Sequence, residues 1–307
     1  GGGVQVTLVE RNPQFISCPI SNLVIGGMKT MADITHDYDT LRGKWGVRVI
    51  QDEVLGVDSG KRSVRLAKGG ELSYDRLVLS PGVDFLWDQL PGLNSADAQA
   101  KVLHAWKAGP QTVALRKQLE AMPDGGVYAL SIPKAPYRCP PGPYERACMV
   151  ATLIRRRQLK ARVVLLDPNP MMQVFSRVFG NQYRDLITYV PQARIKAVDP
   201  FGRTVTTDFE TLRFDDAILM PPQQAGDLAW QAGLVAAGTD WAAVDPASHR
   251  TLTDPRVFVI GDMIDRVSPL FGHYPKTGEM ALRQGQIAAA HIAAEAAGRE
   301  APTLLPA

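Results

Sequence analysis

Cysteine, glutamate and arginine side chains stand together in one proline-rich stretch, residues 139–147, whose sequence is CPPGPYERA. The stretch lies between residues 127–132, which predict a strand, and residues 149–157, which predict a helix. A strand–turn–helix corner of this kind ordinarily uses backbone N–H groups to hold a dinucleotide pyrophosphate. Five prolines between positions 133 and 143 lack an N–H, so the corner has lost many of these donors. The cysteine and glutamate that stand there instead indicate chemistry other than nicotinamide chemistry.

The elements around this corner follow βαβ order. Residues 161–167 predict a second strand, which ends in Asp167, at the position where a dinucleotide-binding unit has its ribose-binding acid. Because no glycine loop precedes it, we interpret Asp167 as a structural residue. Farther along, residues 175–190 predict a helix and residues 193–212 predict paired strands.

A second set of such elements begins near the N-terminus. Residues 4–9 predict a strand that ends in Glu10, an acid placed to bind adenosine ribose hydroxyls. Three glycines precede this strand, but the strand and helix that would carry a G-x-G-x-x-G fingerprint are absent. Residues 31–45 have helical spacing, and residues 47–73 alternate as a β-meander does.

Two further strands of this set end in small residues. The buried strand predicted at residues 74–82 ends in Pro81-Gly82, which allow a ligand to approach the backbone closely. The strand predicted at residues 256–262 ends in Gly261-Asp262 and precedes a long helix at residues 278–297. A carboxylate there suits a ribityl hydroxyl, with the helix N-terminus directed at the pyrimidine edge of a flavin.

Composition excludes several classes of function. The 307 residues are 45% hydrophobic with a net charge of +3, which is too mild and dispersed to indicate nucleic-acid binding. No apolar run approaches the roughly 20 residues of a membrane span. The five histidines are scattered without metal-ligand spacing, so we expect no metal. Three cysteines are an odd number, and Cys148 is expected to be a buried helical thiol.

Taken together, these residues resemble the flavin disulfide reductase superfamily with two dinucleotide-binding domains, and most closely the flavoprotein subunit of flavocytochrome c sulfide dehydrogenase. The resemblance covers nearly the whole chain. It is strongest in four motifs, which read SCPISN from Ser17, WKAG from Trp106, CPPGPYERA from Cys139 and MPPQQAG from Met220.

The resemblance implies an FAD joined through a thioether to Cys18. It also implies that Cys139 is the first cysteine of a redox disulfide over the flavin, with Glu145 as a nearby catalytic acid or base. The implied cofactor-binding residues are Glu10, Cys18, Pro81, Gly82, Gly261, Asp262, Pro275 and Lys276. Haem is expected only on a partner, a c-type cytochrome subunit, and the family implies a periplasmic location.

The family also implies an α/β fold with two Rossmann-like domains. We expect an FAD-binding domain at residues 1–93 plus 234–307, and a degenerate NAD-type domain carrying the redox cysteine at residues 94–233. The missing fingerprint, and a second redox cysteine expected just past Ala307, predict a chain truncated at both ends.

The activity implied is oxidation of sulfide to sulfur or polysulfide. Hydrosulfide would attack the disulfide of Cys139, whose thiolate we expect to be favoured by the following helix N-terminus and by Arg138 and Arg146. Glu145 would shuttle a proton, or would only offset the helix dipole.

Three alternatives have different requirements. A sulfide:quinone oxidoreductase would need an apolar, membrane-facing C-terminal region, which this sequence lacks. An NAD(P)H-dependent disulfide reductase would need a second G-x-G-x-x-G and a C-x₄-C pair, and neither occurs. The third alternative is a flavin-free remnant that only docks to a cytochrome.

Overall fold

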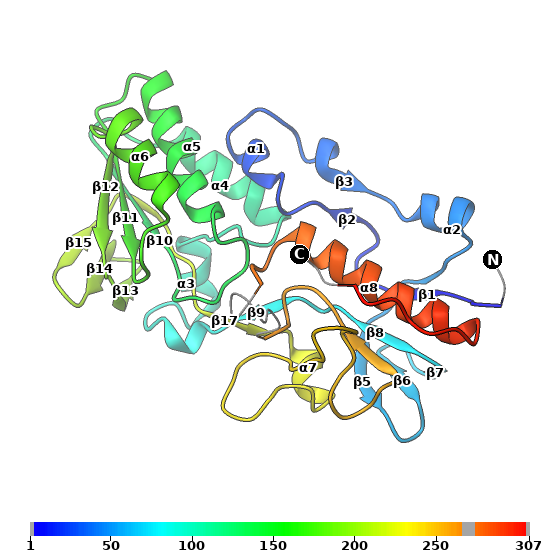
Figure 1. Ribbon diagram of the computed structural model, residues 1–307. Coiled ribbons are helices and arrows are strands. Elements are labelled where there is room, and N and C mark those ends of the chain that lie inside the picture. The colour runs from blue at the N-terminus through cyan, green and yellow to red at the C-terminus, as the bar shows by residue number, and fades with distance from the viewer. Residues whose placement is uncertain (1–2, 266–273, 305–307) are drawn as a thin grey trace. The chain divides into compact units, whose positions relative to one another are not determined.

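The computed structural model describes residues 3–265 and 274–304 and divides into two compact units (Figure 1). The first unit comprises Gly1–Phe15, His36–Asp84 and Gln224–Ala307, and the second comprises Ile16–Thr35 and Phe85–Gln223. Each is a mixed α/β unit of the dinucleotide-binding type. The domain limits predicted from the sequence at residues 93 and 233 stay a prediction.

A four-stranded parallel sheet in the order β12-β11-β10-β16 forms the centre of the second unit. Its strands pair in uninterrupted parallel register, for example Ala129 with Val164 and with Ala217. The bounds are β10 (Val127–Ser131), β11 (Arg162–Asp167), β12 (Ile187–Pro191) and β16 (Asp216–Ile218).

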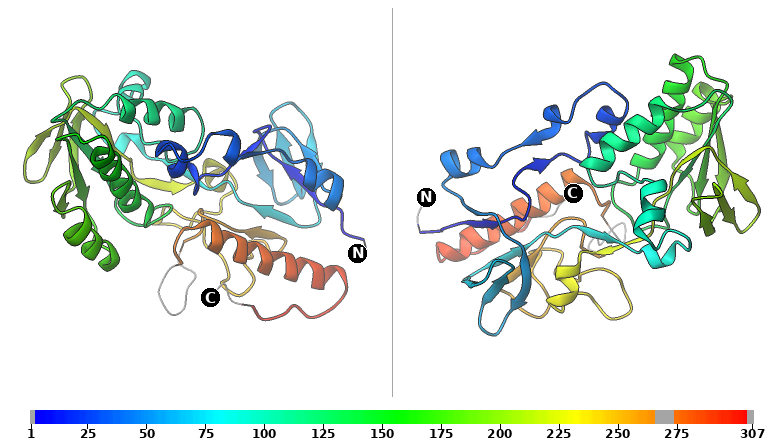
Figure 2. Two further views of the ribbon diagram at one scale, coloured as in Figure 1. Left: turned by 90° about the horizontal axis from the view of Figure 1, so that it is seen from above. Right: turned by 180° about the vertical axis from the view of Figure 1, so that it is seen from behind.

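Both faces of this sheet are covered, which explains why its central strands β10 and β11 are mostly apolar. Alternate residues such as Leu130 and Leu165 point into one core, shared with helices α4, α5 and α6. Their neighbours Ala129 and Val164 point into a second core, shared with α3 and the antiparallel sheet β13-β14-β15. Figures 1 and 2 show α4, α5 and α6 on one side of the parallel sheet and the antiparallel sheet on the other. The bounds are α3 (Ala96–Lys101), α4 (Pro110–Glu120), α5 (Gly142–Arg156), α6 (Gln173–Gln182), β13 (Ile195–Asp199), β14 (Thr204–Thr207) and β15 (Thr211–Arg213).

The first unit contains two parallel strand pairs, β1 with β4 and β8 with β18, and the antiparallel meander β5-β6-β7. Its core gathers the strand residues Leu79, Val257 and Val259 with Trp241 and Met263. The bounds are β1 (Thr7–Val9), α2 (Asp39–Trp45), β4 (Arg48–Ile50), β5 (Val54–Asp58), β6 (Ser63–Leu66), β7 (Glu71–Ser73), β8 (Leu77–Leu79), α7 (Asp227–Gln231), β18 (Val257–Val259) and α8 (Gly278–Ala296).

Short elements complete the chain, several of them at the boundaries of the units. They are β2 (Phe15–Ile16), α1 (Ser21–Ile25), η1 (Ala32–Ile34), β3 (Thr35–His36), β9 (Val83–Phe85), η2 (Trp87–Gln89) and β17 (Gln223–Ala225).

Three sequence predictions of secondary structure were wrong. The helix predicted at 31–45 is confined to α2, because the chain forms only a 3-10 turn at Ala32–Ile34 and then the strand β3 before α2 begins. The helix predicted at 175–190 ends at Gln182, and the residues that follow extend the parallel sheet as β12. Helix α5 begins at Gly142, seven residues before the predicted start at 149. Its prolines occupy the N-cap and the first turn, where a missing N–H costs nothing.

Candidate functional site

The proline-rich corner of the second unit places Cys139 directly before the first turn of α5. Cys139 has a left-handed backbone with φ of 58°, which is uncommon for a residue with a side chain. Its carbonyl accepts a hydrogen bond from the N–H of Gly142 at 2.9 Å. One residue earlier, the carbonyl of Arg138 accepts the indole N–H of Trp106 at 2.9 Å. These bonds fix the backbone on both sides of the thiol.

Gly142 is required by close packing. A Cβ atom at this position would lie 2.7 Å from Cη2 of Trp106 and 2.9 Å from Sγ of Cys139. Both distances are shorter than ordinary van der Waals contacts. The indole ring and the Cys139 thiol therefore both pack against Gly142 in the first turn of α5, and a side chain there would force one of them to shift.

The Cys139 thiol is less acidic than the sequence suggested. Burial raises its pKa above the ordinary value, and the Glu145 carboxylate raises it further. The Gly142 N–H and the guanidinium groups of Arg138 and Arg146 act in the opposite direction but do not prevail. The expectation that the helix N-terminus would favour a thiolate therefore fails, because desolvation disfavours the charged form more strongly.

Glu145 lies in the first turn of α5 and is exposed to solvent. An acid there offsets the helix dipole, which contributes about 0.3–1 kcal/mol. Its influence on the pKa of Cys139 means that it is also near the thiol.

Cys18 lies in the same unit, beside the WKAG segment. Its Sγ accepts a hydrogen bond from the N–H of Ala108 at 3.4 Å, and its carbonyl accepts one from the Ser21 hydroxyl at 2.6 Å. The fold thus brings together two of the motifs noted in the sequence, although 90 residues separate the two partners. All three cysteines are free thiols, and burial raises the pKa of Cys148 to about 11.

His104 is a buried neutral imidazole two residues before the WKAG segment. Its Nδ1 accepts the N–H of Trp106 at 2.9 Å, and its ring packs against Phe85 with centroids 4.4 Å apart. Burial lowers its pKa to about 3, and the positive charges of Arg146 and Lys107 lower it as well. His104 therefore serves as a hydrogen-bond acceptor in this structure.

Asp167 is fully buried and is satisfied by protein donors. Its carboxylate accepts hydrogen bonds from the hydroxyl of Tyr144, from the hydroxyl of Tyr189 at 3.0 Å, and from the N–H and Nδ2 of Asn169 at 2.8 and 3.0 Å. The same Asn169 amide donates to the carbonyl of Pro133, at the start of the corner. These bonds agree with the interpretation of Asp167 as structural.

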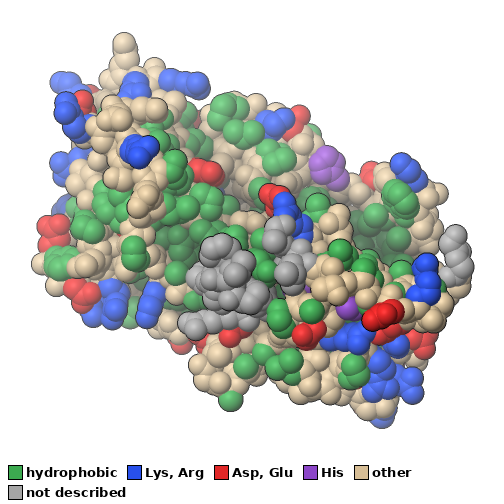
Figure 3. Space-filling model, viewed as in Figure 1, with side chains coloured by type: hydrophobic (Ala, Val, Ile, Leu, Met, Phe, Trp, Pro, Cys, Tyr) green, Lys and Arg blue, Asp and Glu red, His purple; other side chains and the backbone are tan. Residues whose placement is uncertain are grey.

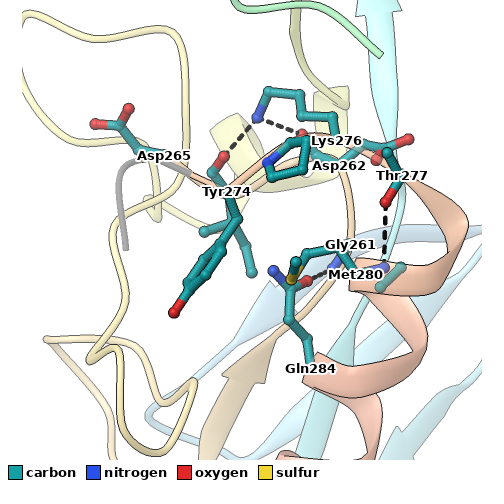
Figure 4. Close-up of a pocket in the computed structure, with 11 residues that line it drawn as sticks. Gly261, Asp262, Asp265, Tyr274, Lys276, Thr277, Met280 and Gln284 are labelled. Carbon is teal, nitrogen blue, oxygen red and sulfur yellow. Dashed lines mark hydrogen bonds between the residues drawn. The ribbon is translucent and has the colours of Figure 1, made fainter. Parts of the chain in front are cut away.

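In the first unit, Gly261 and Asp262 follow β18 and face the beginning of α8 (Figure 4). Gly261 has a left-handed backbone with φ of 82°, and its N–H donates to Oε1 of Gln284 at 2.7 Å. Thr277 caps α8 by accepting the N–H of Met280. Sequence reasoning missed Gln284, for which the only signal was its position in the long helix predicted at residues 278–297.

Lys276 is directed away from solvent. Its Nζ donates to the carbonyls of Asp262 and Ile264 (Figure 4). The same Nζ lies 3.7 Å from the centroid of the Trp241 ring. Burial lowers its pKa to about 8, against the opposing effect of the Asp262 and Asp265 carboxylates. Its neighbour Pro275 lines the same small hollow.

The remaining predicted binding residues also belong to the first unit. Glu10 follows β1, and its Oε1 accepts hydrogen bonds from the N–H and Nδ2 of Asn12 at 2.8 and 2.7 Å. Gly82 has φ of 75°, with nothing within 4 Å of the place a Cβ would occupy. Pro81 and the carbonyl of Gly82 instead pack against Gly226.

Other classes of site receive no support from the described residues. Within 3–265 and 274–304, no group of three or more His, Cys, Asp or Glu side chains could hold a metal ion. No helix in that part of the chain is long and apolar enough to cross a membrane. On the face shown in Figure 3, Lys and Arg side chains are spread over several places and lie among acidic ones.

Comparison with known proteins gives a family match over part of the chain. Residues 112–221 match the family model for the central part of the flavoprotein chain of sulfide dehydrogenase (flavocytochrome c). The match includes the whole corner and α5. The chain is also 23% identical over 281 residues to mitochondrial sulfide:quinone oxidoreductase of Mus musculus, covering 85% of this chain and 60% of that protein. The corresponding protein of Dictyostelium discoideum is 22% identical over 272 residues, covering 84% and 59%. The chain thus spans about 60% of the length of these curated relatives.

Solved structures agree on the fold. The sulfide:quinone oxidoreductase of Aquifex aeolicus has a TM-score of 0.76 at 18% identity, covering 96% of this chain and 71% of that chain. An NAD-dependent persulfide reductase from A. fulgidus has a TM-score of 0.74 at 16% identity, covering 95% and 55%. The fold is that of FAD/NAD(P)-binding oxidoreductases. Together with the family match, it supports a flavoprotein of the FAD-dependent disulfide reductase superfamily that resembles sulfide:quinone oxidoreductase and flavocytochrome c.

Proposed function

We propose that this chain is the flavoprotein part of an enzyme that oxidises sulfide with FAD and passes the electrons to a c-type cytochrome subunit in the periplasm. The observation that carries the proposal is the contact between Cys18 and Ala108 in the unit that also holds Cys139. Cys18 and Cys139, to which the resemblance assigns the flavin bond and the redox role, thus lie in one compact unit, each beside the WKAG segment. The match of residues 112–221 to the flavocytochrome c model supports the same assignment.

The residues of the first unit fit an FAD. Acids follow β1 and β18, at Glu10 and Asp262, where a ribose and a ribityl chain would be bound. Left-handed glycines at 82 and 261 leave open space beside the backbone, since the nearest atom to an added Cβ is 3.9 Å away at Gly261. Pro275 and Lys276 would lie near the pyrimidine edge. The resemblance assigns the covalent bond to Cys18. FAD, when bound, would accept an electron pair and release single electrons to haem.

Cys139 would be the residue that handles sulfur. Its raised pKa keeps it a neutral thiol near neutral pH, so a proton must leave before it can act as a nucleophile. Glu145 is exposed on the first turn of α5 and disfavours the thiolate by its charge. It would therefore accept and release that proton rather than stabilise the thiolate.

A second candidate is electron transfer to a quinone. It is favoured by the relatives that match most of the chain, which are sulfide:quinone oxidoreductases in mouse and Dictyostelium. The remaining alternative, a flavin-free remnant, predicts a colourless protein.

The first experiment is the visible spectrum of the purified protein before and after acid precipitation, with mass spectrometry of the peptide containing Cys18. Yellow colour and an FAD mass retained on that peptide are expected. A colourless protein with unmodified Cys18 would contradict the proposal and favour the remnant.

The acceptor is then identified with the yellow protein. Sulfide is added anaerobically, and the rates of reduction of cytochrome c and of a soluble ubiquinone analogue are compared. Faster reduction of cytochrome c is expected, whereas reduction of the quinone alone would assign the second candidate.

A further inference from the structure

Arg146 is a buried arginine on α5 whose hydrogen bonds have no part in the proposed function above. Its side chain is 2% exposed. Nε donates to Oδ1 of Asn22 at 3.0 Å, and the two terminal nitrogens donate to the carbonyls of His104 and of Ala105, the latter at 3.1 Å. Within the described part of the chain, no Asp or Glu forms an ion pair with it. Its partners are therefore oxygen atoms of two distant segments of the same unit.

Those two segments carry the surroundings of Cys18. Asn22 lies in α1, four residues after Cys18, and the end of α1 packs on α5, since Gly26 lies against Met149. The carbonyls of residues 104 and 105 belong to the segment whose Ala108 N–H contacts the Cys18 sulfur. One guanidinium group thus joins both sides of the Cys18 thiol to α5.

The same group brings a positive charge to the side of Cys139. Its central carbon lies 4.7 Å from the centroid of the Trp106 ring, and the edge of that ring touches Gly142 beside the Cys139 sulfur. The ionisable groups that face the thiol are Glu145 and Arg146 from α5 and Tyr137 and Arg138 from the corner. Arg146 is held by three hydrogen bonds and a ring face, so its charge is fixed in position.

A purely structural arginine would be a costly choice at this place. Removing a guanidinium from water is unfavourable, and a well-packed apolar side chain often stabilises a core as well or better. The planar fork of arginine spreads its donors over three nitrogen atoms and reaches three separate acceptors, whereas lysine holds its three donors on one nitrogen and an apolar side chain has none. The geometry therefore favours a role in positioning.

We propose that Arg146 is the positioning residue that holds the Cys18 segment against the Cys139 helix and keeps a fixed positive charge beside the Cys139 thiol. The idea that both thiols serve one reaction rests on the proposed function. The contacts of Arg146 with Asn22 and with the Trp106 ring are observed independently of it.

The test uses four variants of the full chain. Arg146→Met removes charge and hydrogen bonds, and Arg146→Lys keeps the charge without the fork. Asn22→Ala removes one partner and leaves Arg146 intact. Arg157→Met is the matched control, because Arg157 ends the same helix and also donates to two carbonyls, those of Leu119 and Met122, far along α5 from the corner.

Two measurements separate the two parts of the role. The first is the rate of Cys139 alkylation by iodoacetamide between pH 7 and 10, followed by peptide mass spectrometry, because only the thiolate reacts. The second is hydrogen–deuterium exchange of peptides from residues 16–35, with peptides from residues 195–213 as the internal reference. Neither measurement needs flavin or sulfide, so failure of the proposed function leaves both readable.

For Arg146→Met we expect alkylation at pH 8 to slow about threefold, with the pH profile moved upward, because a nearby cation lowers a thiol pKa. Exchange in residues 16–35 should become about tenfold faster as the hydrogen bond from Arg146 to Asn22 is lost. Arg146→Lys should keep the wild-type alkylation profile but show the fast exchange, and so should Asn22→Ala. Arg157→Met should change neither.

Other outcomes overturn the proposal. If Asn22→Ala leaves exchange of residues 16–35 unchanged, Arg146 does not hold that segment. If Arg146→Lys and Arg146→Met slow the alkylation of Cys139 equally, the positive charge at residue 146 plays no part. If Arg157→Met reproduces the effects of Arg146→Met, both reflect general loss of stability. Asn22→Ala keeps the test decisive even if Arg146→Met does not fold.

Discussion

Replacing Gly142 by alanine should destabilise the protein, although alanine is the better helix former. Gly142 is the first residue of α5, and a Cβ there would lie 2.7 Å from Cη2 of Trp106 and 2.9 Å from the Cys139 sulfur. The indole cannot move aside easily. It is 7% exposed, its N–H is bonded to the Arg138 carbonyl, and its face is covered by the Arg146 guanidinium.

The size of the effect follows from two opposing contributions. Forcing an extra methyl group into a well-packed site costs about 1–3 kcal/mol. Alanine in place of glycine contributes at most about 1 kcal/mol to helix stability, and less at a first residue. We therefore expect the free energy of unfolding to fall by about 1–2 kcal/mol.

Gly180 provides the matched control in the same unit. It lies in α6, and nothing is within 4 Å of the position its Cβ would take. Gly180→Ala should raise the free energy of unfolding by up to about 1 kcal/mol, opposite in sign to Gly142→Ala.

Urea unfolding of wild type and both variants, monitored by tryptophan fluorescence at one pH, measures the difference. The dependence of free energy on urea should be unchanged, so that midpoints can be compared directly. If Gly142→Ala is as stable as wild type or more so while Gly180→Ala behaves as expected, the contact between the Trp106 ring, Cys139 and the first turn of α5 is not tight, and the reasoning fails.

Three further outcomes are expected. Asp167→Asn should lower the free energy of unfolding by about 2–4 kcal/mol in urea titrations, because an amide N–H₂ would face the buried donors, whereas Tyr189→Phe, which removes one donor, should cost about 1 kcal/mol. The folded-state pKa of His104, about 3, lies below its ordinary 6.5, so its contribution to stability is fully present above pH 6.5 and is lost as pH falls toward 3. At pH 5 this loss is about 2 kcal/mol, and His104→Asn should show a correspondingly shallower decline in urea midpoint between pH 7 and 5; equal declines would show that another group is responsible. Cys18→Ser should retain no flavin after acid precipitation, and acid-stable colour in that variant would place the covalent bond elsewhere.

Much of the secondary structure was predictable because its signals are local. Strands β10 and β11 are mostly apolar runs, α8 shows helical spacing, and the β5-β6-β7 meander alternates between turns. The sequence prediction placed the helix start at residue 149, after the prolines of the corner, whereas two of these prolines lie at the N-cap and in the first turn of α5. Position relative to the first turn decides whether a proline ends or starts a helix, and a local pattern leaves that open.

What the sequence by itself determined was which residues carry chemistry: the thiols at 18, 139 and 148, the acids that end strands, and the glycines that follow them. Tertiary structure alone decided how those groups behave. Burial raises the pKa of Cys139, which the helix N-terminus and two arginines were expected to lower. The fork of Arg146 reaches Asn22, 124 residues away, and the carboxylate of Asp167 is enclosed by tyrosines from α5 and β12. Spacing along the chain sets local conformation, but desolvation and hydrogen-bond partners depend on segments that only folding brings together.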